Sequence, residues 1–596
     1  MKKYMLTVAV AVSAVFCGCS KFLDRKPLDQ SSASTFMTNQ AEMEQSLVGV
    51  YASAMWVFPN NTPLLFNIEA TTDLAIRRGG NAEDLIALGD AGPFLINNAI
   101  PSSAWSQAYR LVQRANQHLT GMENGRANVS AQQFGRIRAE ALVLRAWAYY
   151  HLMGWFGDVP YYREAPTIDQ LLSSARTPMA TIATDLYKDL DEAAAAFTAA
   201  NTQPVQAMGT VNRGVALGLK AKIAMLMKDW RTAATASKAV MDLGQYGLNP
   251  RYTDLFVLSG QQTNTNREIM FNQTYPTDVL DPQNWLAVIT VPRQVSQSQS
   301  SHFPSQNLVD RFEAIDGQRI DQSTVYNAAT PSQNRDPRLR WTVYMQGDTM
   351  VHNTARTATP TNAAPYTQPK ERTIFNIYSN VRRRFNWVTG VFDNVNGNND
   401  WIGATAAGIQ WQVSATGNIG GVGYVWRKYI DSTQFVWETK TGYILMRYAD
   451  ILLTYAEAKI ELGELDGTVT SAINLVRARA GMPAVTLASN LRQIVRRERV
   501  AEFAGEGLRL FDLRRWGIYE KANSFPVVGV SLDPANPAAT PTFDADDVPN
   551  YSGSVNQRLR TRNQTRNNNN ARYRLWPIPQ FEIDANKGIT QNPGWQ

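Results

Sequence analysis

The chain has 596 residues, of which 44% are hydrophobic and 18% are charged, an ordinary balance for one large globular domain or two closely packed lobes. Its formal net charge of +7 is small for so large a surface and does not indicate a nucleic-acid-binding protein. The only cysteines, Cys17 and Cys19, lie near the N-terminus, which leaves the rest of the chain without a thiol for a disulfide, a zinc site or a nucleophile.

The N-terminus has the pattern of a bacterial export signal. Two lysines precede an apolar run from Met5 to Phe16, which has the length of a secretory signal and is too short to span a bilayer. Gly18 followed by Cys19 resembles a lipoprotein cleavage site, after which the cysteine becomes the acylated first residue. Plain cleavage nearby, with an incidental cysteine, is the alternative. We predict a signal peptide over residues 1–18 and lipid attachment at Cys19.

Two helices are expected in the region that follows. Asn39 and Glu42 have the spacing of a capping box, which predicts a helix that continues to Met55. A second helix is expected from Ser103 to Asn116, where apolar residues recur at helical spacing.

The segment between these helices, residues 70–85, is polar and contains two glycines, which is typical of a loop. Arg77 in this loop is a candidate donor of hydrogen bonds to ligand oxygens. The alternative is that Arg77 is an ordinary solvated loop residue.

A longer helix is predicted from Phe134 to Trp155, ending before Gly157 and Pro160. Alanine, leucine and aromatic residues occupy most of its faces, so we expect it to be largely buried. It carries one of the four histidines of the chain, which are scattered and lack the spacing of metal ligands. We therefore predict core or surface roles for them and no metal site: His118, His151, His302 and His352.

A helical hairpin is predicted from Asn212 to Leu243, with its turn at residues 228–230. Ala221 and Ala233 are twelve residues apart, the separation at which tetratricopeptide repeats place small residues so that two helices pack closely. One such hairpin cannot bury its own apolar faces, so a similar partner is expected elsewhere in the chain.

Residues 251–441 lack long helical periodicity and are rich in Asn, Gln, Thr, Gly and Trp, which favours loops and short strands over the helical scaffold. Ligand specificity is expected in such a region. Indole rings stack on the apolar faces of sugars, and amide and carboxylate groups bind sugar hydroxyls. The candidate ligand-binding residues of this region are Trp401, Trp411, Asn398, Asn399, Asp400, Trp285 and Trp387. The alternative for each tryptophan is a core position.

Two other patterns in the chain do not support a further site. The run from Asp393 to Asp400 superficially suggests calcium, but aligning its glycine with the sixth position of an EF-hand loop puts Phe392 at the first. The arginines between Arg558 and Arg574 lie among asparagines with few aromatic residues, which favours a solvated or salt-bridged edge over a nucleic-acid surface.

The expected second hairpin extends from Met446 to Ala480, with its turn at residues 463–467. One further helix is predicted from Leu491 to Gly517, with acidic and basic residues at helical spacing. Such carboxylates could serve acid–base catalysis, but an arginine lies within helical reach of each, which lowers the pKa of a carboxyl group and suits a structural role.

Several segments together closely resemble the SusD/RagB outer-membrane lipoproteins of Bacteroidetes. They are Leu144–Tyr162, Arg447–Ala458, Arg496–Gly517 and the closing Leu575–Trp595, with support from Cys19–Pro27 and Leu47–Tyr51. The resemblance covers nearly the whole chain. It implies a mostly helical fold with tetratricopeptide-like hairpins, display at the cell surface, and capture of oligosaccharide or, in some members, peptide for a TonB-dependent transporter of the SusC type.

We therefore expect a mostly α fold in which a helical hairpin scaffold supports an irregular lobe of loops and short strands. The predicted regions are the signal peptide 1–18, an N-terminal helical region 19–250, a ligand-binding region 251–441 and a C-terminal helical region 442–596 packed on the N-terminal one.

The expected function is binding without catalysis or cofactor, in the outer membrane through the lipid anchor and with no nucleic acid partner. A peptide-binding member of the same family is one alternative, and a scaffold that uses its repeats only for protein contacts is another. An exported glycoside hydrolase is less favoured, because no motif proposes two carboxylates facing each other across a cleft.

Lipid attachment at Cys19 gives the first testable prediction. Cys19→Ala should abolish incorporation of labelled fatty acid and release the protein from membranes washed in high salt, because the acyl chains supply the membrane affinity. Fractionation of cells expressing the wild type and the variant measures both effects. Equal retention of the variant after the wash would contradict lipid attachment at this residue.

Overall fold

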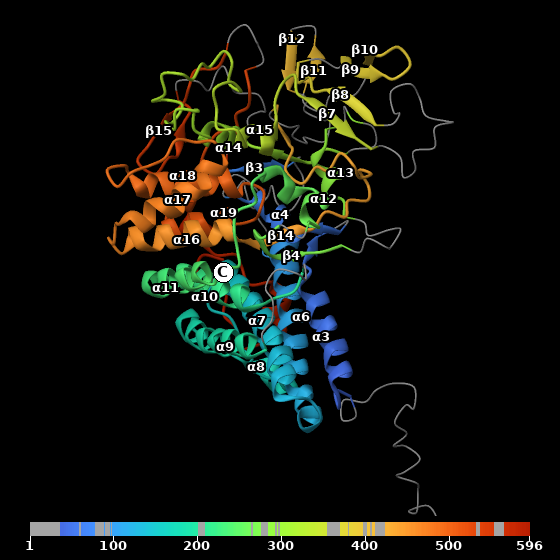
Figure 1. The fold of residues 1–596 in the computed structure, drawn as a ribbon, viewed down its shortest axis with the longest axis vertical. Helices are drawn as coiled ribbons and strands as arrows, with labels where there is room; N and C mark the ends of the chain where they lie inside the picture. The colour runs from blue at the N-terminus through green and yellow to red at the C-terminus, as the bar shows by residue number, and fades with distance from the viewer. Residues whose placement is uncertain are drawn as a thin grey trace, which may run out of the picture.

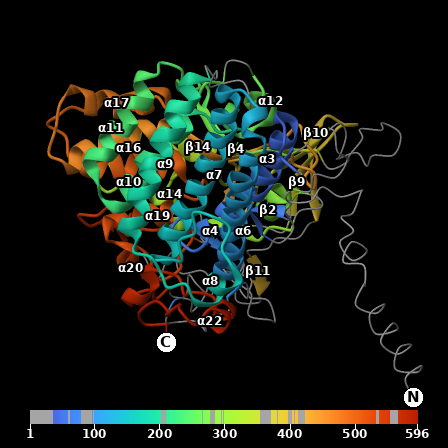
Figure 2. The same ribbon diagram turned by 90° about the horizontal axis from the view of Figure 1, so that it is seen from below.

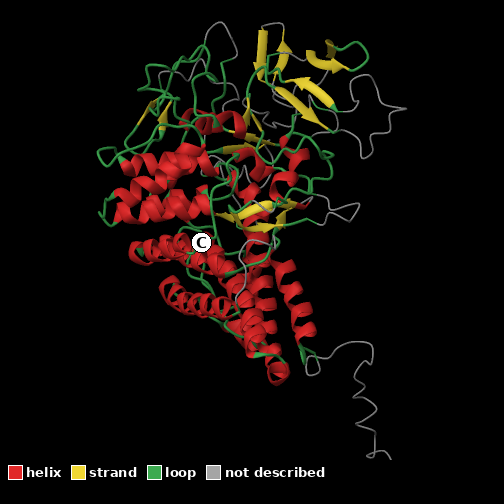
Figure 3. Cartoon of the chain, viewed as in Figure 1, coloured by secondary structure: helices red, strands yellow, loops and turns green. Residues whose placement is uncertain are grey.

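The computed structural model describes residues 36–58, 61–77, 89, 96, 98–200, 209–263, 266–275, 284–292, 295, 299–353, 370–378, 381–396, 402–405, 408–411, 423–531, 537–552 and 566–595. Helices form the lower part of the molecule and strands with loops form the upper part (Figure 1, Figure 3). This arrangement confirms the predicted helical scaffold with an irregular lobe. None of the helices in these ranges combines the length and the apolar character needed to cross a membrane.

The first helical layer contains α3 (Gln40–Ala54), α6 (Ala99–Gly121), α7 (Ala131–Phe156) and α9 (Met179–Ala199), with α7 packed against the other three (Figure 1). Nearly every side chain of α7 after its second turn is buried, as its composition predicts. The N-cap of α3 is Asn39, whose side chain accepts the Glu42 N–H at 3.1 Å. The Glu42 carboxylate binds Thr38 instead, so the predicted capping box is only half formed.

Both predicted hairpins are present and stack on this layer. The first consists of α10 (Arg213–Met227) and α11 (Trp230–Asp242), and the second consists of α16 (Tyr448–Glu461) and α17 (Gly467–Arg479). Helix α9 packs on α10, and α11 packs on α16, so the hairpins continue the first layer (Figure 1). Helices α10 and α11 pack on each other, and Ala221 on the first and Ala233 on the second are fully buried, as expected for small packing residues.

The single helix predicted over residues 491–517 is wrong, because the segment forms two helices, α18 (Leu491–Phe503) and α19 (Arg509–Trp516). Gly505 and Gly507 lie between them with φ of 81° and 75°, the left-handed conformation that glycine adopts without steric cost. A Cβ atom on Gly507 would lie 2.8 Å from the Cβ atom of Leu65, so the turn also needs glycine for close packing.

Strands occur mainly in the upper lobe (Figure 3). The largest sheet is antiparallel with the order β10-β9-β8-β7, where β7 is Thr349–His352, β8 is Glu371–Ile374, β9 is Val381–Asn386 and β10 is Val391–Asn396. Antiparallel pairs are formed by β6 (Val343–Tyr344) with β13 (Val425–Trp426), β4 (Ile269–Gln273) with β14 (Tyr443–Arg447), and β11 (Ile402–Thr405) with β12 (Gly408–Trp411).

Short elements connect these parts. They are β1 (Val57–Phe58), β2 (Thr62–Pro63), α4 (Leu64–Glu69), β3 (Ala75–Arg77), η2 (Met122–Asn128), α8 (Ile168–Ser173), η3 (Tyr252–Phe256), α12 (Leu258–Gln261), α13 (Leu286–Thr290), β5 (His302–Pro304), α14 (Gln306–Arg311), α15 (Arg338–Thr342), α20 (Tyr519–Ala522), β15 (Thr542–Phe543), β16 (Pro549–Asn550), η4 (Ala571–Arg574) and α22 (Gln580–Ala585).

The C-terminal segment packs against the end of α7, and α22 lies beside α8 at one edge of the molecule (Figure 2). The indole of Trp576 stacks on that of Trp155 with ring centroids 5.6 Å apart, and its backbone N–H donates to the Trp155 carbonyl. The Asn592 amide donates to the carbonyls of Phe156 and Trp576. These contacts hold the closing segment of the chain against the end of α7.

The arginines near the C-terminus divide between two environments. Arg574 pairs with Glu520 at the surface, in agreement with the salt-bridged edge that the sequence predicts. Arg566 differs from that prediction, because it is buried and donates to the carbonyls of Ala70, Thr72 and Ala75. It thereby ties the C-terminal segment to the chain around β3.

The histidines are all buried core residues, as predicted. Burial lowers the pKa of His118 and His352 to about 4 and that of His151 to about 3, because the charged imidazolium loses its hydration.

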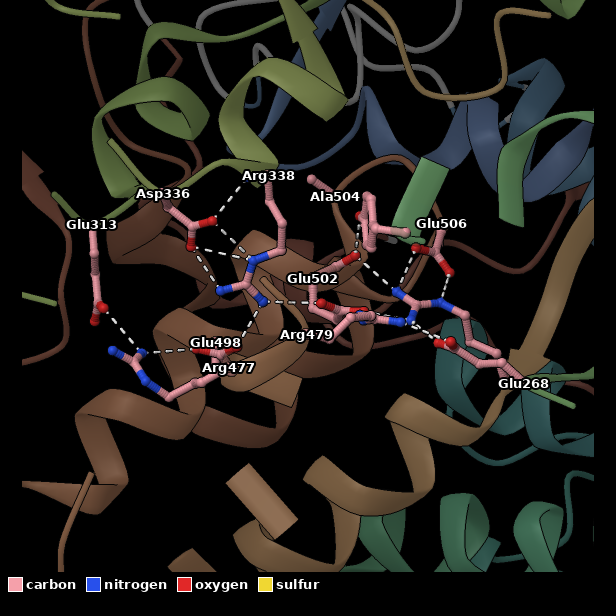
Figure 4. A network of polar contacts seen from close by, with 12 residues as sticks. Glu268, Glu313, Asp336, Arg338, Arg477, Arg479, Glu498, Glu502, Ala504 and Glu506 are labelled. Atoms are coloured by element: carbon pink, nitrogen blue, oxygen red, sulfur yellow. Dashed lines mark hydrogen bonds and ion pairs between the residues drawn. The ribbon is translucent and has the colours of Figure 1, made fainter. Parts of the chain in front are cut away.

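A buried network of carboxylates and cations joins α18 to the elements around it (Figure 4). Glu502 accepts from Arg338 at 2.9 Å, from Arg447 at 2.5 Å and from Arg479. Burial alone would raise the pKa of Glu502, but these three guanidiniums hold it well below its usual range. The predicted structural role of these acids is therefore supported. For Glu502 the predicted partners within the same helix are wrong, because its arginines come from α15, β14 and α17. For Asp512 the prediction holds, because Arg515 on the same helix pairs with it at 2.7 Å.

The network gives a prediction about stability. Glu502→Gln should lower the free energy of unfolding by about 3–5 kcal/mol, because three buried guanidiniums lose the charge that compensates them. Urea unfolding followed by circular dichroism measures this effect.

The matched control is Glu464→Gln, which removes the exposed ion pair with Arg231. Its unfolding midpoint should stay close to that of the wild type, because solvent screens an exposed pair. A Glu502→Gln protein as stable as this control would contradict the role given to the network.

Glu69 gives a prediction with a defined pH window. Burial raises the pKa of its carboxyl group from 4.5 to about 7, although the N–H groups of Gly505 and Gly507 donate to it at 3.2 Å each. Between pH 4.5 and 7 the folded protein therefore keeps a proton that the unfolded chain releases, so this group makes stability fall as pH rises.

We expect the free energy of unfolding of the wild type, minus that of Glu69→Gln, to fall by about 1.4 kcal/mol per pH unit between pH 4.5 and 7. Outside this window the difference should stay constant. Urea titrations of both proteins from pH 4 to 8 measure the difference, and any constant cost of the amide cancels from the slope. A pH-independent difference would contradict the raised pKa.

Candidate functional site

A cavity in the upper lobe has a volume of about 260 Å³. Its lining comes from α14, from the loops that follow α14, β6 and β8, and from the chain before β13 and after α20. Residues far apart in the sequence, from Gln306 to Ala538, therefore form one concave surface. Such a cavity, with aromatic side chains and a few convergent polar groups, is typical of a small-molecule site.

Three tyrosines give the cavity its aromatic character: Tyr326 and Tyr378 are half-buried, and Tyr424 is buried. The Tyr326 ring lies against the Arg335 guanidinium, with the guanidinium carbon 5.2 Å from the ring centroid. Arg335 in turn donates to the carbonyls of Val309 and Phe312 at 2.6 and 2.9 Å. The loop that carries Tyr326 is thus fixed to the end of α14, so the ring is positioned before any ligand arrives.

Polar groups in the cavity form a chain of hydrogen bonds. The Tyr424 hydroxyl donates to the Gln306 side-chain oxygen at 2.8 Å, and the Gln306 amide nitrogen donates to an Asp310 carboxylate oxygen at 2.9 Å. Gln306 and Asp310 are four residues apart on α14, so they share one face of the helix. Ser305 caps that helix by accepting the Leu308 N–H at 3.0 Å.

The rim of the cavity is held by amide side chains. The Gln346 side-chain oxygen accepts the Ile377 N–H at 2.8 Å, and the Asn376 side-chain oxygen accepts the Tyr378 N–H at 3.0 Å. These bonds fix the turn after β8 against the turn after β6, which places the Tyr378 ring at the cavity.

The cavity has the chemistry for binding a ligand rich in hydroxyl groups. Rings supply stacking surfaces, while phenol, amide and carboxylate groups exchange hydrogen bonds with hydroxyls. Asp310 is the only carboxylate among the described residues that line the cavity. A glycoside hydrolase needs two facing carboxylates, one as acid and one as base or nucleophile.

The sequence-predicted ligand residues with described side chains lie outside this cavity. Trp285 packs on Trp437 with ring centroids 4.8 Å apart. The indole N–H of Trp387 donates to the Lys370 carbonyl, and the Arg372 guanidinium carbon lies 4.7 Å from the centroid of the Trp387 ring. Arg77 is not in the predicted loop, because it ends β3 and pairs with β5. These three residues do not line the 260 Å³ cavity.

The other predicted residues cannot be placed. Trp401, Asn398, Asn399, Asp400 and the lipid-attachment residue Cys19 lie outside the described residues. Trp411 ends β12, but its side chain also lies outside the description. A ligand role for the predicted tryptophans, asparagines and Asp400 stays a prediction.

Sequence reasoning missed Tyr326, Tyr378, Tyr424, Gln306 and Asp310. Tryptophan is the commoner stacking residue for sugars, and no local pattern marks a tyrosine that lines a cavity. The one usable signal was the pair Gln306 and Asp310, two polar residues at helical spacing beside apolar ones. Its partners come from loops about 20 to 230 residues away.

Comparisons with known proteins agree with this architecture. Residues 255–595 match the family model described as "SusD family", and residues 21–224 match one described as "Starch-binding associating with outer membrane". The chain belongs to the SusD family.

SusD-like relatives extend over much of the chain. SusD-like protein P2 of Formosa agariphila is 25% identical over 553 residues, which cover 86% of this chain and 91% of that protein. SusD-like protein P25 of the same organism is 24% identical over 276 residues, which cover 44% of this chain and 50% of that protein.

Solved SusD-like structures share the fold. A SusD-like carbohydrate binding protein from Bacteroides fragilis superposes with a TM-score of 0.69 at 24% identity, covering 93% of this chain and 100% of that one. A laminarin binding SusD-like protein gives 0.62 at 21% identity, with coverages of 94% and 100%. Surface glycan-binding protein A from Bacteroides thetaiotaomicron, in complex with laminarihexaose, gives 0.60 at 18% identity, with coverages of 93% and 100%.

Proposed function

We propose that this SusD-family protein is a cell-surface lipoprotein that captures an oligosaccharide and delivers it to a TonB-dependent outer-membrane transporter. The observation that carries the proposal is the cavity in which Tyr326, Tyr378 and Tyr424 surround the hydrogen-bonded pair Gln306 and Asp310. Sugars combine apolar ring faces with a rim of hydroxyls, so one surface of tyrosines and amides satisfies both features.

The class of ligand is supported from outside the cavity as well. Solved proteins with this fold include a laminarin binding SusD-like protein and a protein in complex with laminarihexaose. Laminarin and laminarihexaose are both glycans. Within the described lining, the cavity offers one carboxylate and no basic residue, which suits a neutral oligosaccharide better than a strongly charged one.

The same cavity supports the proposal of binding without catalysis. Asp310 bonds to Gln306 and has no second carboxylate opposite it in the described lining, so a bound glycosidic bond would meet no acid–base pair. We infer that the bound saccharide leaves unchanged and passes to the transporter. Anchoring through Cys19 would keep the cavity at the membrane surface where the transporter lies.

The proposal predicts the effect of removing the ring of Tyr326. Tyr326→Ala should weaken oligosaccharide binding at least about fivefold, because an aromatic contact contributes about 1 kcal/mol or more. Isothermal titration calorimetry with laminarihexaose and a panel of other neutral oligosaccharides measures this loss. Chromatography of the recovered ligands tests for turnover.

Tyr187→Ala is the matched control, because Tyr187 is also half-buried but lies on α9 in the helical layer. Its affinity for the oligosaccharide should equal that of the wild type. Unchanged affinity in Tyr326→Ala would remove the ligand from this cavity. A wild-type protein that binds only peptides would establish the peptide alternative, and steady hydrolysis of a glycan would establish the enzyme.

A further inference from the structure

A second cleft, of about 220 Å³, lies on the opposite face of the β6–β13 strand pair from the first cavity. Side chains alternate between the two faces of a strand. Met345 and Tyr424 therefore face the first cavity, while Tyr344 and Arg427 face the second cleft. One strand pair thus separates two hollows with different linings.

Arg427 is the distinctive residue of this second cleft. Its side chain is half-buried, and the guanidinium carbon lies 5.2 Å from the centroid of the Tyr344 ring. One guanidinium nitrogen donates a hydrogen bond to the Arg340 carbonyl at 3.0 Å. Within the part of the chain that the structure describes, no carboxylate pairs with it. A guanidinium carries five N–H donors, so most of those of Arg427 remain for a ligand.

The neighbouring cations differ from Arg427 in this respect. Arg340 pairs with Asp348 at 3.2 Å. Lys428 lines the same cleft, but its ammonium donates to Glu506 at 2.8 Å and to two carbonyls. No carboxylate occurs among the described residues that line the cleft. The positive charge of Arg427 is therefore the one that the cleft leaves uncompensated.

The rest of the lining suits a sugar ring. The half-buried indole of Trp341 is held by stacking on Tyr252, with ring centroids 5.5 Å apart and an angle of 27° between the planes. The hydroxyls of Thr253 and Ser432 also line the cleft. A stacking ring, hydroxyl groups and an unpaired guanidinium together match a ring that carries hydroxyls and an anion.

We propose that this cleft binds an acidic sugar residue, with the sugar carboxylate or sulfate on the Arg427 guanidinium and the sugar ring on Trp341. A planar guanidinium recognises the paired oxygens of such anions through two parallel hydrogen bonds, which an ammonium cannot do. The site goes beyond the neutral-oligosaccharide cavity of the proposed function and takes from it only the class of ligand, a saccharide.

Calorimetry on the full mature chain tests the site. The carboxylate probe is trigalacturonate, with its methyl ester as the uncharged counterpart, and the sulfate probe is a sulfated galactan tetrasaccharide. Arg427→Gln should weaken binding of one acidic probe at least about tenfold, because a hydrogen bond to a charged group is lost. The affinity of the wild type for the methyl ester should be as low as the affinity of Arg427→Gln for trigalacturonate. The acidic probe whose affinity falls in Arg427→Gln shows whether the site takes a carboxylate or a sulfate.

Two further variants separate this site from general electrostatic attraction and from loss of fold. Arg340→Gln removes the neighbouring cation that already has a carboxylate partner, so its affinity for the acidic probes should match the wild type. Trp341→Phe keeps an aromatic ring against Tyr252 but shortens the stacking surface, so it should weaken binding with little change in melting temperature.

Several results would overturn the proposal. They are a wild type that binds neither acidic probe, an Arg427→Gln protein that binds like the wild type, an equal loss of affinity for the acidic probes in Arg340→Gln, and inorganic sulfate binding as tightly as the saccharide.

Tyr326→Ala separates this cleft from the first cavity, because its affinity for the acidic probes should stay within about twofold of the wild type. Loss of acidic binding in that variant would move the ligand into the first cavity. Acidic binding that depends on Arg427, in a protein that binds no neutral oligosaccharide, would support this site while the proposed function fails.

Discussion

The buried charge of Glu502 is the interaction on which the rest of the structure depends. Its carboxylate meets three guanidiniums, Arg338 from α15, Arg447 from β14 and Arg479 from α17. A carboxylate in a protein interior is costly unless it is paired and hydrogen-bonded, and so is each guanidinium. The four side chains satisfy one another only when the second hairpin, α18 and the upper lobe are all in place.

The same network sets the position of both hollows of the upper lobe. Arg338 is the first residue of α15, which leads directly into β6. Lys428 follows β13 by two residues and donates to Glu506. Both strands of the β6–β13 pair are therefore tied to the buried charges, and this pair is the wall between the tyrosine-lined cavity and the Arg427 cleft. A site built on loops gains a fixed geometry from ion pairs buried beneath it.

The division of charge between interior and surface also explains the different character of the two hollows. The arginines of the network donate their hydrogen bonds to buried carboxylates. Arg447, for example, donates to Glu268, Glu502 and Glu506. The tyrosine-lined cavity has only Asp310, which is engaged by Gln306. Arg427 has no carboxylate partner among the described residues, and apart from one bond to the Arg340 carbonyl its donors face the cleft. The charge of the lining residues, as well as the shape, therefore distinguishes the ligands that suit the cavity from those that suit the cleft.

The amino-acid sequence by itself determined the helical scaffold, because the burial of α7 follows from its local composition and the hairpin from the spacing of Ala221 and Ala233. The family resemblance also comes from the sequence, and the closing segment that carries part of it contains Trp576 and Asn592, which contact the end of α7. Local pattern failed at α18 and α19, where Glu69, more than 400 residues away, holds the glycine turn that divides them.

Only the tertiary structure decided which side chains meet. The sequence directed attention to tryptophans, whereas Trp285 packs on Trp437 and the described cavity is lined by Tyr326 and Tyr424. Glu502 has arginines within reach on its own helix, yet its partners come from three other elements. Helical spacing is a local property, but pairing of buried charges and closure of a cavity depend on long-range packing, which a one-dimensional pattern does not contain.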